Sequence, residues 1–258
     1  MKYFNDNIEI HTTVIIKEGN VLGENVSVGC YTIVGKNVTI GQNTKIGNGV
    51  IIHDGTIIGS NVRIDDNAVI GKLPMSVSTS ALKIDNNLSS CNIGDNCIIG
   101  TAAILYKGCS IGSNCLIADI STIRENVSVG NNTIIGRGVA VENNCIIGSH
   151  CKLETNVYIT AYSELEDYVF IAPGVVTSND NYAARLKGKE YSFKGVTVKR
   201  GGRIGAQATI LPGKVISEDA FAAAGSVITK DIPARKINCG NPAKYFRDVP
   251  EDQLIDNQ

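Results

Sequence analysis

The chain contains no tryptophan, five phenylalanines and three histidines in 258 residues. A core with so few aromatic side chains must be built from aliphatic residues, and catalysis by histidine has few candidates. The net charge is −1, so nothing indicates a surface that binds nucleic acid or another polyanion. No apolar run reaches the about 18 residues of a membrane span, and the first ten residues lack the apolar segment of a signal peptide.

The segment from Cys91 to Ala172 follows an unbroken period of six residues. A helix repeats every 3.6 residues and a strand every 2, so neither explains this period. The residue two positions before each periodic aliphatic is small or β-branched, and a glycine often follows the aliphatic, where we expect a corner with positive φ. The aliphatic positions are Ile93, Ile99, Leu105, Ile111, Ile117, Ile123, Val129, Ile135, Val141, Ile147, Leu153, Ile159, Leu165 and Ile171. This pattern predicts a parallel β-helix with three six-residue repeats per coil.

The same period runs from Ile16 to Ile70 and from Val198 to Ile228, and two excursions interrupt it. Loops of this length usually have a function, although an insertion without a function explains them equally well. We expect an all-β fold of about ten coils. Its predicted parts are an N-terminal cap at 1–15, the β-helix at 16–232 with loops at 72–91 and 178–195, and a tail with a short helix at 233–258.

Six of the eight cysteines occupy the small inward position of the repeat, and the chain has no C-x-x-C motif. These six are Cys91, Cys97, Cys109, Cys115, Cys145 and Cys151. We therefore interpret them as core residues and not as metal ligands or disulfides. Rows of buried thiols favour a reducing compartment, the cytoplasm.

Four segments carry a resemblance to a known family: RIGAQATILPG, AAAGSVITKDIP, CGNPAK and LEDYVFIAPGVVTSNDNYAAR. They resemble the hexapeptide-repeat acyltransferases, and the last is most similar to N-acyltransferases of nucleotide-linked amino sugars. The resemblance implies a left-handed parallel β-helix, a homotrimer, and acetyl-CoA or another acyl-CoA as co-substrate. Aliphatic residues at outward positions, such as Ile98 and Ile146, independently favour self-association.

The resemblance also places coenzyme A along the last coils. The matching or neighbouring residues are Ala206 and Ala224 for the pantetheine arm, Thr229 and Lys230 on the phosphate side, and Arg235 and Lys244 for the 3′-phosphate. A lysine near a C-terminus is, however, usually just solvated.

Amino-sugar acyltransferases of this family often have a histidine two coils above a conspicuous asparagine. In this chain the asparagine is Asn156, and the histidine positions fall at Asp119 and Thr122. The 37 residues from 119 to 156 amount to two coils plus one residue, so both side chains can flank one groove. An aspartate is a poor base at its ordinary pKa. We therefore expect Asp119 and Asn156 to hold the substrate amine, while the departing sulfur takes the proton. Alternatively, both are solvated corner residues.

Further candidates surround these two. Arg124, Glu125 and Arg137 project from nearby coils and either bind a diphosphate or form ion pairs between subunits. The resemblance implies that the 178–195 loop reaches a neighbour's nucleotide sugar. Its candidate residues are Asn179, Asp180, Tyr182 and Arg185, the last able to pair with phosphate.

Each of the three histidines has a structural alternative. His11 lies in the cap, and His53 lies at a corner far from the coils that resemble the coenzyme site. His150 lies at an outward corner and is a weaker candidate for contact with substrate. Three histidines also occur in the zinc site of γ-class carbonic anhydrases, but His53 and His150 lie about five coils apart, too far to share an ion. We expect no metal.

The prediction is an acyl-CoA-dependent N-acyltransferase that acts on a dTDP- or UDP-linked amino sugar. The alternatives are an acyltransferase for another small amine or hydroxyl acceptor, such as serine or a galactoside, and a non-catalytic β-solenoid. A hydroxyl acceptor needs a true base, which counts against that alternative. The sugar, its nucleotide, the position of its amine and the acyl length stay open.

Overall fold

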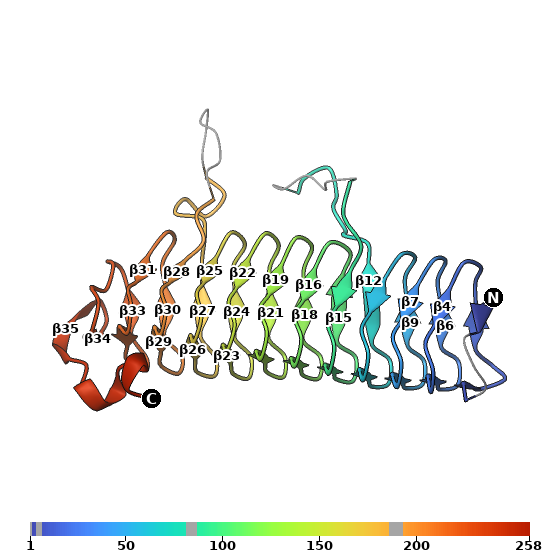
Figure 1. Cartoon of the computed structure of the whole chain (residues 1–258). Helices are drawn as coiled ribbons and strands as arrows, with labels where there is room; N and C mark the ends of the chain where they lie inside the picture. The colour runs from blue at the N-terminus through green and yellow to red at the C-terminus, as the bar shows by residue number, and fades with distance from the viewer. Residues whose placement is uncertain (1, 4–6, 81–86, 186–192) are drawn as a thin grey trace. The chain divides into compact units, whose positions relative to one another are not determined.

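The computed structural model describes residues 2–3, 7–80, 87–185 and 193–258. Two compact units divide the chain, Met1–Asn132 and Thr133–Gln258. Each unit is a β-solenoid of very short strands that pair in parallel with the strand one coil away, 18 residues along the chain where no loop intervenes (Figure 1). No helix in the described residues is long and apolar enough to cross a membrane.

Three sheets form the first unit. The first sheet contains β1 (Lys2–Tyr3), β4 (Val21–Leu22), β7 (Thr39–Ile40), β10 (Ile57–Ile58), β13 (Asn92–Ile93), β16 (Ser110–Ile111) and β19 (Ser128–Val129). The second contains β2 (Glu9–Ile10), β5 (Ser27–Val28), β8 (Lys45–Ile46), β11 (Arg63–Ile64), β14 (Ile98–Ile99) and β17 (Leu116–Ile117). The third contains β3 (Ile15–Ile16), β6 (Ile33–Val34), β9 (Ile51–Ile52), β12 (Val69–Lys72), β15 (Ile104–Tyr106) and β18 (Thr122–Ile123).

The second unit repeats this arrangement. One group of paired strands contains β22 (Ile146–Ile147), β25 (Glu164–Leu165), β28 (Thr197–Val198) and β31 (Val215–Ile216). Another contains β20 (Ile134–Ile135), β23 (Lys152–Leu153), β26 (Phe170–Ile171), β29 (Arg203–Ile204), β32 (Phe221–Ala222), β34 (Lys236–Gly240) and β35 (Ala243–Asp248). The last contains β21 (Ala140–Val141), β24 (Tyr158–Ile159), β27 (Val176–Thr177), β30 (Thr209–Ile210) and β33 (Val227–Ile228).

The coil count is slightly higher than predicted. At three strands per coil, β1 to β33 make eleven coils, against about ten predicted. The difference arises at the N-terminus, because β1 and β2 already pair with β4 and β5 within the residues expected to form a cap.

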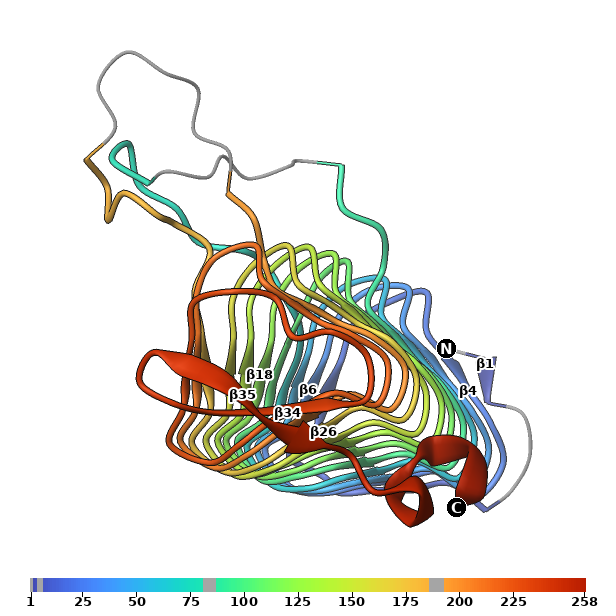
Figure 2. The same cartoon turned by 90° about the vertical axis from the view of Figure 1, so that its left-hand side faces the viewer.

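The C-terminus also differs from the prediction. In place of one helix, an antiparallel hairpin of β34 and β35 is followed by two 3-10 turns, Glu251–Gln253 and Ile255–Asn257 (Figure 2). Ile237, Val249 and Leu254 form a small cluster that packs on Phe221 and Ala223. The hairpin and turns therefore have a hydrophobic cluster of their own.

The core is the predicted one. All fourteen periodic aliphatic residues and all six inward cysteines are buried. The Cys97 thiol donates a hydrogen bond to the carbonyl of Gly112 over 3.0 Å, and Thr44 makes the equivalent bond to Gly59 at 2.9 Å. Burial raises the pKa of Cys145 to about 12 and that of Cys151 to about 11, so both thiols are neutral at pH 7.

The expected role of the glycine after each aliphatic was wrong. Gly94, Gly100 and Gly112 have no positive φ. Glycine is required at these positions because a side chain would clash with the next coil. A Cβ at Gly100 would lie 2.6 Å from the backbone nitrogen of Asp119. The left-handed residue comes two positions later and is usually asparagine, whose short side chain tolerates that conformation.

Both predicted loops leave a coil at the same kind of corner. The first follows β12 and precedes β13, and the second follows β27 and precedes β28. Residues 81–86 of the first and 186–192 of the second lie outside the described residues. In the described part of the first loop, Leu73, Met75 and Val77 expose 60%, 66% and 71% of their surface, an apolar edge at alternate positions.

Candidate functional site

A group of charged and aromatic side chains gathers where the first loop leaves the first unit. Lys72 ends β12, and its register partner Tyr106 ends β15. The Tyr106 ring is buried, with the Lys72 Nζ and the Arg124 Cζ each 5.2 Å from the ring centroid. Two cations thus contact one aromatic ring, whose electron-rich face attracts positive charge. We call Lys72, Tyr106, Arg124, Glu125 and His53 the loop-base cluster.

Arg124 and Glu125 form the ion pair of this cluster. The Arg124 Nε and Nη2 donate to the two carboxylate oxygens of Glu125, each over 2.8 Å. Glu125 is 9% exposed, the one glutamate buried among the described residues. A buried carboxylate requires such a partner, because desolvation of an unpaired charge is costly. The two residues were predicted as substrate-binding candidates, and the structure brings them together.

His53 joins the cluster from the preceding coil. It is half-buried at the corner after β9, and a Cβ at Gly71 would lie 3.3 Å from the His53 Cβ. Burial lowers the pKa of His53, and the nearby charges of Lys17 and Lys72 lower it further, while Asp54 opposes them. The imidazole is therefore neutral at pH 7, as a proton acceptor must be. We did not predict a role for His53, and the sequence reasoning also missed Lys72 and Tyr106.

Some members of the loop-base cluster, but not all, are related by the 18-residue spacing of one coil. His53 and Gly71 are 18 apart, as are Tyr106 and Arg124. Between Lys72 and Tyr106 the loop adds residues that interrupt the period. The two halves of the cluster can be found from sequence separately, but their adjacency cannot.

Asp119 has a structural role in the first unit. The exposed Asp119 accepts, through Oδ1, the backbone N–H of Thr101 over 2.8 Å. Equivalent bonds close other corners, from Lys36 to Asp54, Asn48 to Asp66, Ser60 to Asp95, Ser113 to Asn131 and Ser149 to Asp167. One carboxylate oxygen of Asp119 is therefore already bonded to Thr101 in the preceding coil. Thr122, the other histidine position of the resemblance, lies partly exposed on β18.

Asn156 lies at a corner of the second unit. It has a φ of 60° and is one of eleven asparagines with positive φ among the described residues. Its backbone N–H donates to the carbonyl of Arg137 over 2.9 Å, so these two candidates occupy adjacent coils. Asp119 belongs to the other unit, and a groove shared with Asn156 stays a prediction.

His150 takes part in an aromatic stack. Its ring lies 4.8 Å from the Tyr168 ring at an interplanar angle of 5°, and the Arg200 guanidinium lies 5.6 Å from the Tyr168 centroid. His150 also has positive φ, 59°. These contacts give the ring a packing role at its corner.

The start of the second loop is held by its own polar groups. The Asp180 carboxylate accepts the backbone N–H of Tyr182 at 2.7 Å and of Ala184 at 2.8 Å. These two bonds hold the pKa of Asp180 below its usual value. The Asn179 amide donates to the Ala161 carbonyl at 3.4 Å. Tyr182 and Arg185 remain exposed and available to a ligand.

The coenzyme candidates occupy several edges of the second unit. Ala206 and Ala224 lie at the same corner of consecutive coils, where the Gly225 N–H donates to the Ala206 carbonyl over 2.8 Å. The structure thus brings these two together. Thr229 and Lys230 follow β33, Arg235 precedes the hairpin, and Lys244 lies on β35.

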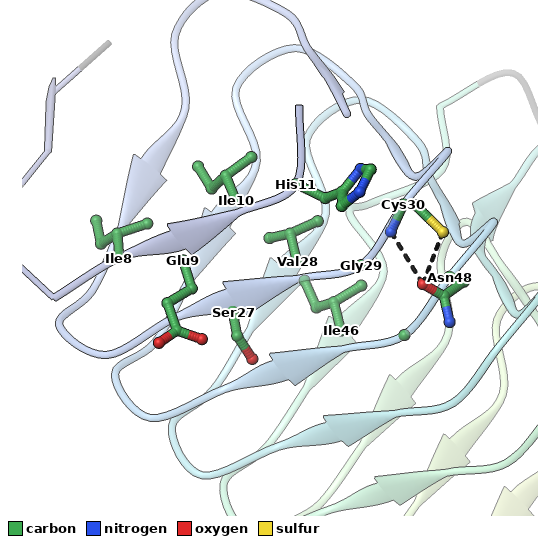
Figure 3. Close-up of a pocket in the computed structure, with 11 residues that line it drawn as sticks. Ile8, Glu9, Ile10, His11, Ser27, Val28, Gly29, Cys30, Ile46 and Asn48 are labelled. Carbon is green, nitrogen blue, oxygen red and sulfur yellow. Dashed lines mark hydrogen bonds between the residues drawn. The ribbon is translucent and has the colours of Figure 1, made fainter. Parts of the chain in front are cut away.

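A hollow of about 700 Å³ lies near the N-terminus of the first unit (Figure 3). Both the backbone nitrogen and the Sγ of Cys30 donate to the Asn48 Oδ1, at 2.9 and 3.0 Å. The His11 Nδ1 lies 2.9 Å from the Thr13 hydroxyl. His11 is exposed and hydrogen-bonds within its own turn, since its Nδ1 also accepts the backbone N–H of Thr13 over 3.3 Å. In the described part of the chain, no group of three histidine, cysteine or acidic residues can hold a metal.

Sequence profiles support the repeat interpretation. A profile described as bacterial transferase hexapeptide (six repeats) matches residues 21–54. A second, described as hexapeptide repeat of succinyl-transferase, matches residues 91–118 and 122–161. The chain therefore carries the hexapeptide repeats that these two profiles describe.

Curated relatives of this hexapeptide-repeat protein include two acetyltransferases. The dTDP-3-amino-3,6-dideoxy-alpha-D-galactopyranose 3-N-acetyltransferase of Aneurinibacillus thermoaerophilus is 42% identical over 71 residues, 26% of this chain and 37% of the relative. The galactoside O-acetyltransferase of Escherichia coli K12 is 34% identical over 83 residues, 31% of this chain and 40% of the relative. The chain therefore spans well under half of these relatives.

Among solved structures, the Arabidopsis UDP-N-acetylglucosamine acyltransferase shares the fold. The TM-score is 0.60 at 20% identity, over 96% of this chain and 76% of that one. At this identity the likeness concerns the fold alone.

Proposed function

We propose that the protein transfers an acyl group, acetyl being the simplest, from coenzyme A to the amine of a nucleotide-linked amino sugar. The observation that carries this proposal is the 42% identity to an amino-sugar N-acetyltransferase. The eight free cysteines, six of them buried, support action in a reducing compartment.

The reaction places few demands on the protein. The amine nitrogen attacks the thioester carbonyl, a C–N bond forms, the C–S bond breaks, and the nitrogen loses a proton. Coenzyme A leaves as the thiolate, which accepts that proton. The protein must align the two reactants and stabilise the oxyanion, which backbone N–H groups can do.

We assign substrate binding to the loop-base cluster. Its two cations, Lys72 and Arg124, attract the diphosphate of the sugar nucleotide. The Glu125 carboxylate attracts the amino group of the sugar. Asp119, Asn156, Arg137 and His150 remain proposed contacts of the sugar, and Asn179, Asp180, Tyr182 and Arg185 remain proposed contacts of a neighbour's nucleotide.

Coenzyme A is proposed to lie along the last coils. The backbone at Ala206 and Ala224, aligned on one edge, suits a linear pantetheine arm. Thr229, Lys230, Arg235 and Lys244 supply donors and positive charge for the phosphates. No metal takes part in this proposal.

Self-association, as a homotrimer, is supported by an apolar stripe on the third sheet of the first unit. The outward residues of five consecutive strands are aliphatic: Ile15, Ile33, Ile51, Val69 and Ile104. Ile15 is 57% exposed and Ile51 38%. Apolar stripes of this kind are usually covered by another chain.

Transfer to a hydroxyl is the second candidate function. The match to galactoside O-acetyltransferase favours it.

A free-thiol release assay with acetyl-CoA distinguishes the two. The acceptors are dTDP- and UDP-linked 3-amino and 4-amino sugars, with serine and a simple galactoside as hydroxyl controls. Turnover with one amino sugar at a kcat/KM at least about a hundredfold above every hydroxyl acceptor supports the proposal. Turnover with a hydroxyl acceptor alone contradicts it.

A further inference from the structure

His53 lies between two glycines at its corner of the first unit. Lys17, Gly35 and His53 hold the same position in consecutive coils, because the backbone N–H of each donates to the following coil at 2.8–3.0 Å. Gly71 follows one coil later, with a φ of 77°, and a Cβ there would lie 3.3 Å from the His53 Cβ. No side chain therefore covers the half-buried imidazole from the positions directly before and after it.

Three charged groups act on this imidazole from the elements around it. Asp54 is its neighbour in the chain, Lys17 comes from the corner two coils before, and Lys72 ends β12. Burial lowers the pKa of His53, the two lysines lower it further, and Asp54 opposes them. In the protein alone the ring is therefore neutral at pH 7.

The net charge around the ring is small for the ligand proposed to bind here. Arg124 and Glu125 neutralise each other in their ion pair, and the two lysines exceed Asp54 by a single positive charge. The diphosphate diester of a nucleotide sugar carries two negative charges and does not titrate near pH 7. Once bound, it leaves an excess of negative charge beside the imidazole, which favours the protonated ring.

Histidine is the residue of this group that can respond at neutral pH. The ordinary pKa of a histidine is about 6.5, whereas those of lysine and the carboxylates lie far from 7. A nearby anion raises the pKa of a histidine towards and beyond neutrality. The charge deficit of the site can therefore be removed by one proton on His53.

We propose that His53 takes up a proton from solvent when the diphosphate of a nucleotide sugar binds at the loop-base cluster, and that the imidazolium adds a positive charge to the site. This role of His53 depends on the substrate site proposed above and concerns binding, not transfer of the acyl group. Because linkage is reciprocal, proton uptake makes the affinity for the nucleotide sugar fall as the pH rises.

NMR of the full chain tests this role directly, since the protein has only three histidines. With 13C-labelled histidine, the ring Cε1–H signals are followed from about pH 5 to about pH 8, with and without saturating dTDP-glucose or UDP-glucose. These probes carry the diphosphate and no amine. The titration midpoint of His53 is expected to rise by about one pH unit or more on binding, and that of the exposed His11 to stay unchanged.

The signals are assigned with His53→Gln and His11→Gln. If His53→Gln does not fold, His11→Gln and His150→Gln assign the remaining signal by elimination. The wild-type titration then still decides the question.

Calorimetry measures the same event as proton uptake and as affinity. Binding enthalpies in two buffers of different ionisation enthalpy give the number of protons taken up, which is expected to be largest between the two midpoints of His53. The Kd of the wild type is expected to rise about tenfold from about pH 5 to about pH 8. His53→Gln is expected to lose the uptake and most of this pH dependence, and His11→Gln, the matched control, to keep both.

Binding of either nucleotide sugar without a change in the His53 midpoint would overturn this role and leave the proposed function standing. So would a proton uptake that survives unchanged in His53→Gln. Failure of both nucleotide sugars to bind at every pH would contradict the substrate site itself, and the role of His53 with it.

Discussion

The guanidinium of Arg124 holds the carboxylate of Glu125 through two parallel hydrogen bonds of 2.8 Å at the base of the first loop. The two residues are neighbours in the chain, yet the pair depends on the coils around it, since Tyr106 from the preceding coil contacts the same guanidinium. This relationship links the stability of the first unit to the proposed substrate site.

Removal of the Glu125 charge should therefore affect both. Glu125→Ala leaves Arg124 without its carboxylate in a partly buried place and should lower the free energy of unfolding by about 2–4 kcal/mol. Glu125→Gln keeps one acceptor and should fold, while kcat/KM for the amino sugar falls by about tenfold or more. Urea unfolding and the thiol release assay measure the two effects. Unchanged kcat/KM in a folded Glu125→Gln would remove the residue from the site.

His53 should make stability depend on pH. Because burial and neighbouring lysines lower its pKa in the folded state, the unfolded chain binds a proton more readily than the folded one. The stabilisation from the neutral ring is present above the unfolded pKa of about 6.5 and is lost as pH falls from there towards the folded pKa.

Urea unfolding at pH 7.5 and pH 5.5 tests this dependence. The difference in unfolding free energy between the two pH values should be smaller in His53→Gln than in the wild type. An equal difference in both proteins would show that His53 does not contribute.

The proposed role of Asn156 in substrate binding can be tested in a variant that keeps the backbone conformation of its corner. Glycine adopts positive φ without strain, so Asn156→Gly should keep the fold, whereas Asn156→Ala should cost about 1–2 kcal/mol. If Asn156 holds the substrate amine, Asn156→Gly should also lower kcat/KM by about tenfold. Asn114→Gly, with a φ of 58° at the original asparagine, is the control and should keep full activity. Equal activity in the two glycine variants would assign Asn156 to the turn alone.

The thiols provide a test of the core. Burial raises the pKa of Cys145 and Cys151, and the structure leaves only Cys30 and Cys239 partly exposed. A thiol reagent should therefore label two cysteines of the native protein and all eight after unfolding. Cys97→Thr should be tolerated, because Thr44 makes the same bond at its own inward position. Rapid native labelling of more than two thiols would contradict the inward assignment.

The repeat could be predicted from sequence because each inward position obeys a local rule of size. A period of six requires a large aliphatic beside a small residue, and Ile99 with Cys97 satisfies that rule without knowledge of the rest of the chain. Which residue a corner of the coil requires depends less on the neighbouring sequence and more on the adjacent coil. The glycines were misinterpreted because the constraint on Gly100 comes from Asp119, a full coil away.

The candidate site was harder to predict for the same reason. Arg124 and Glu125 were selected from sequence as charged residues on a coil, but Lys72 and Tyr106 were not, since the loop between them breaks the period. Asp119 stood out because of its position relative to Asn156, and sequence gave no sign that one of its oxygens is bonded to Thr101.

The most direct measurement of the proposed function is the fate of the acyl carbon. The protein is mixed with carbonyl-13C-labelled acetyl-CoA and, in separate reactions, with each amino-sugar nucleotide of the acceptor panel, and the products are examined by carbon NMR. The account predicts an amide carbonyl coupled to the sugar nitrogen when that nitrogen is 15N-labelled. An ester carbonyl, or label that remains on coenzyme A with every amino sugar, would contradict it.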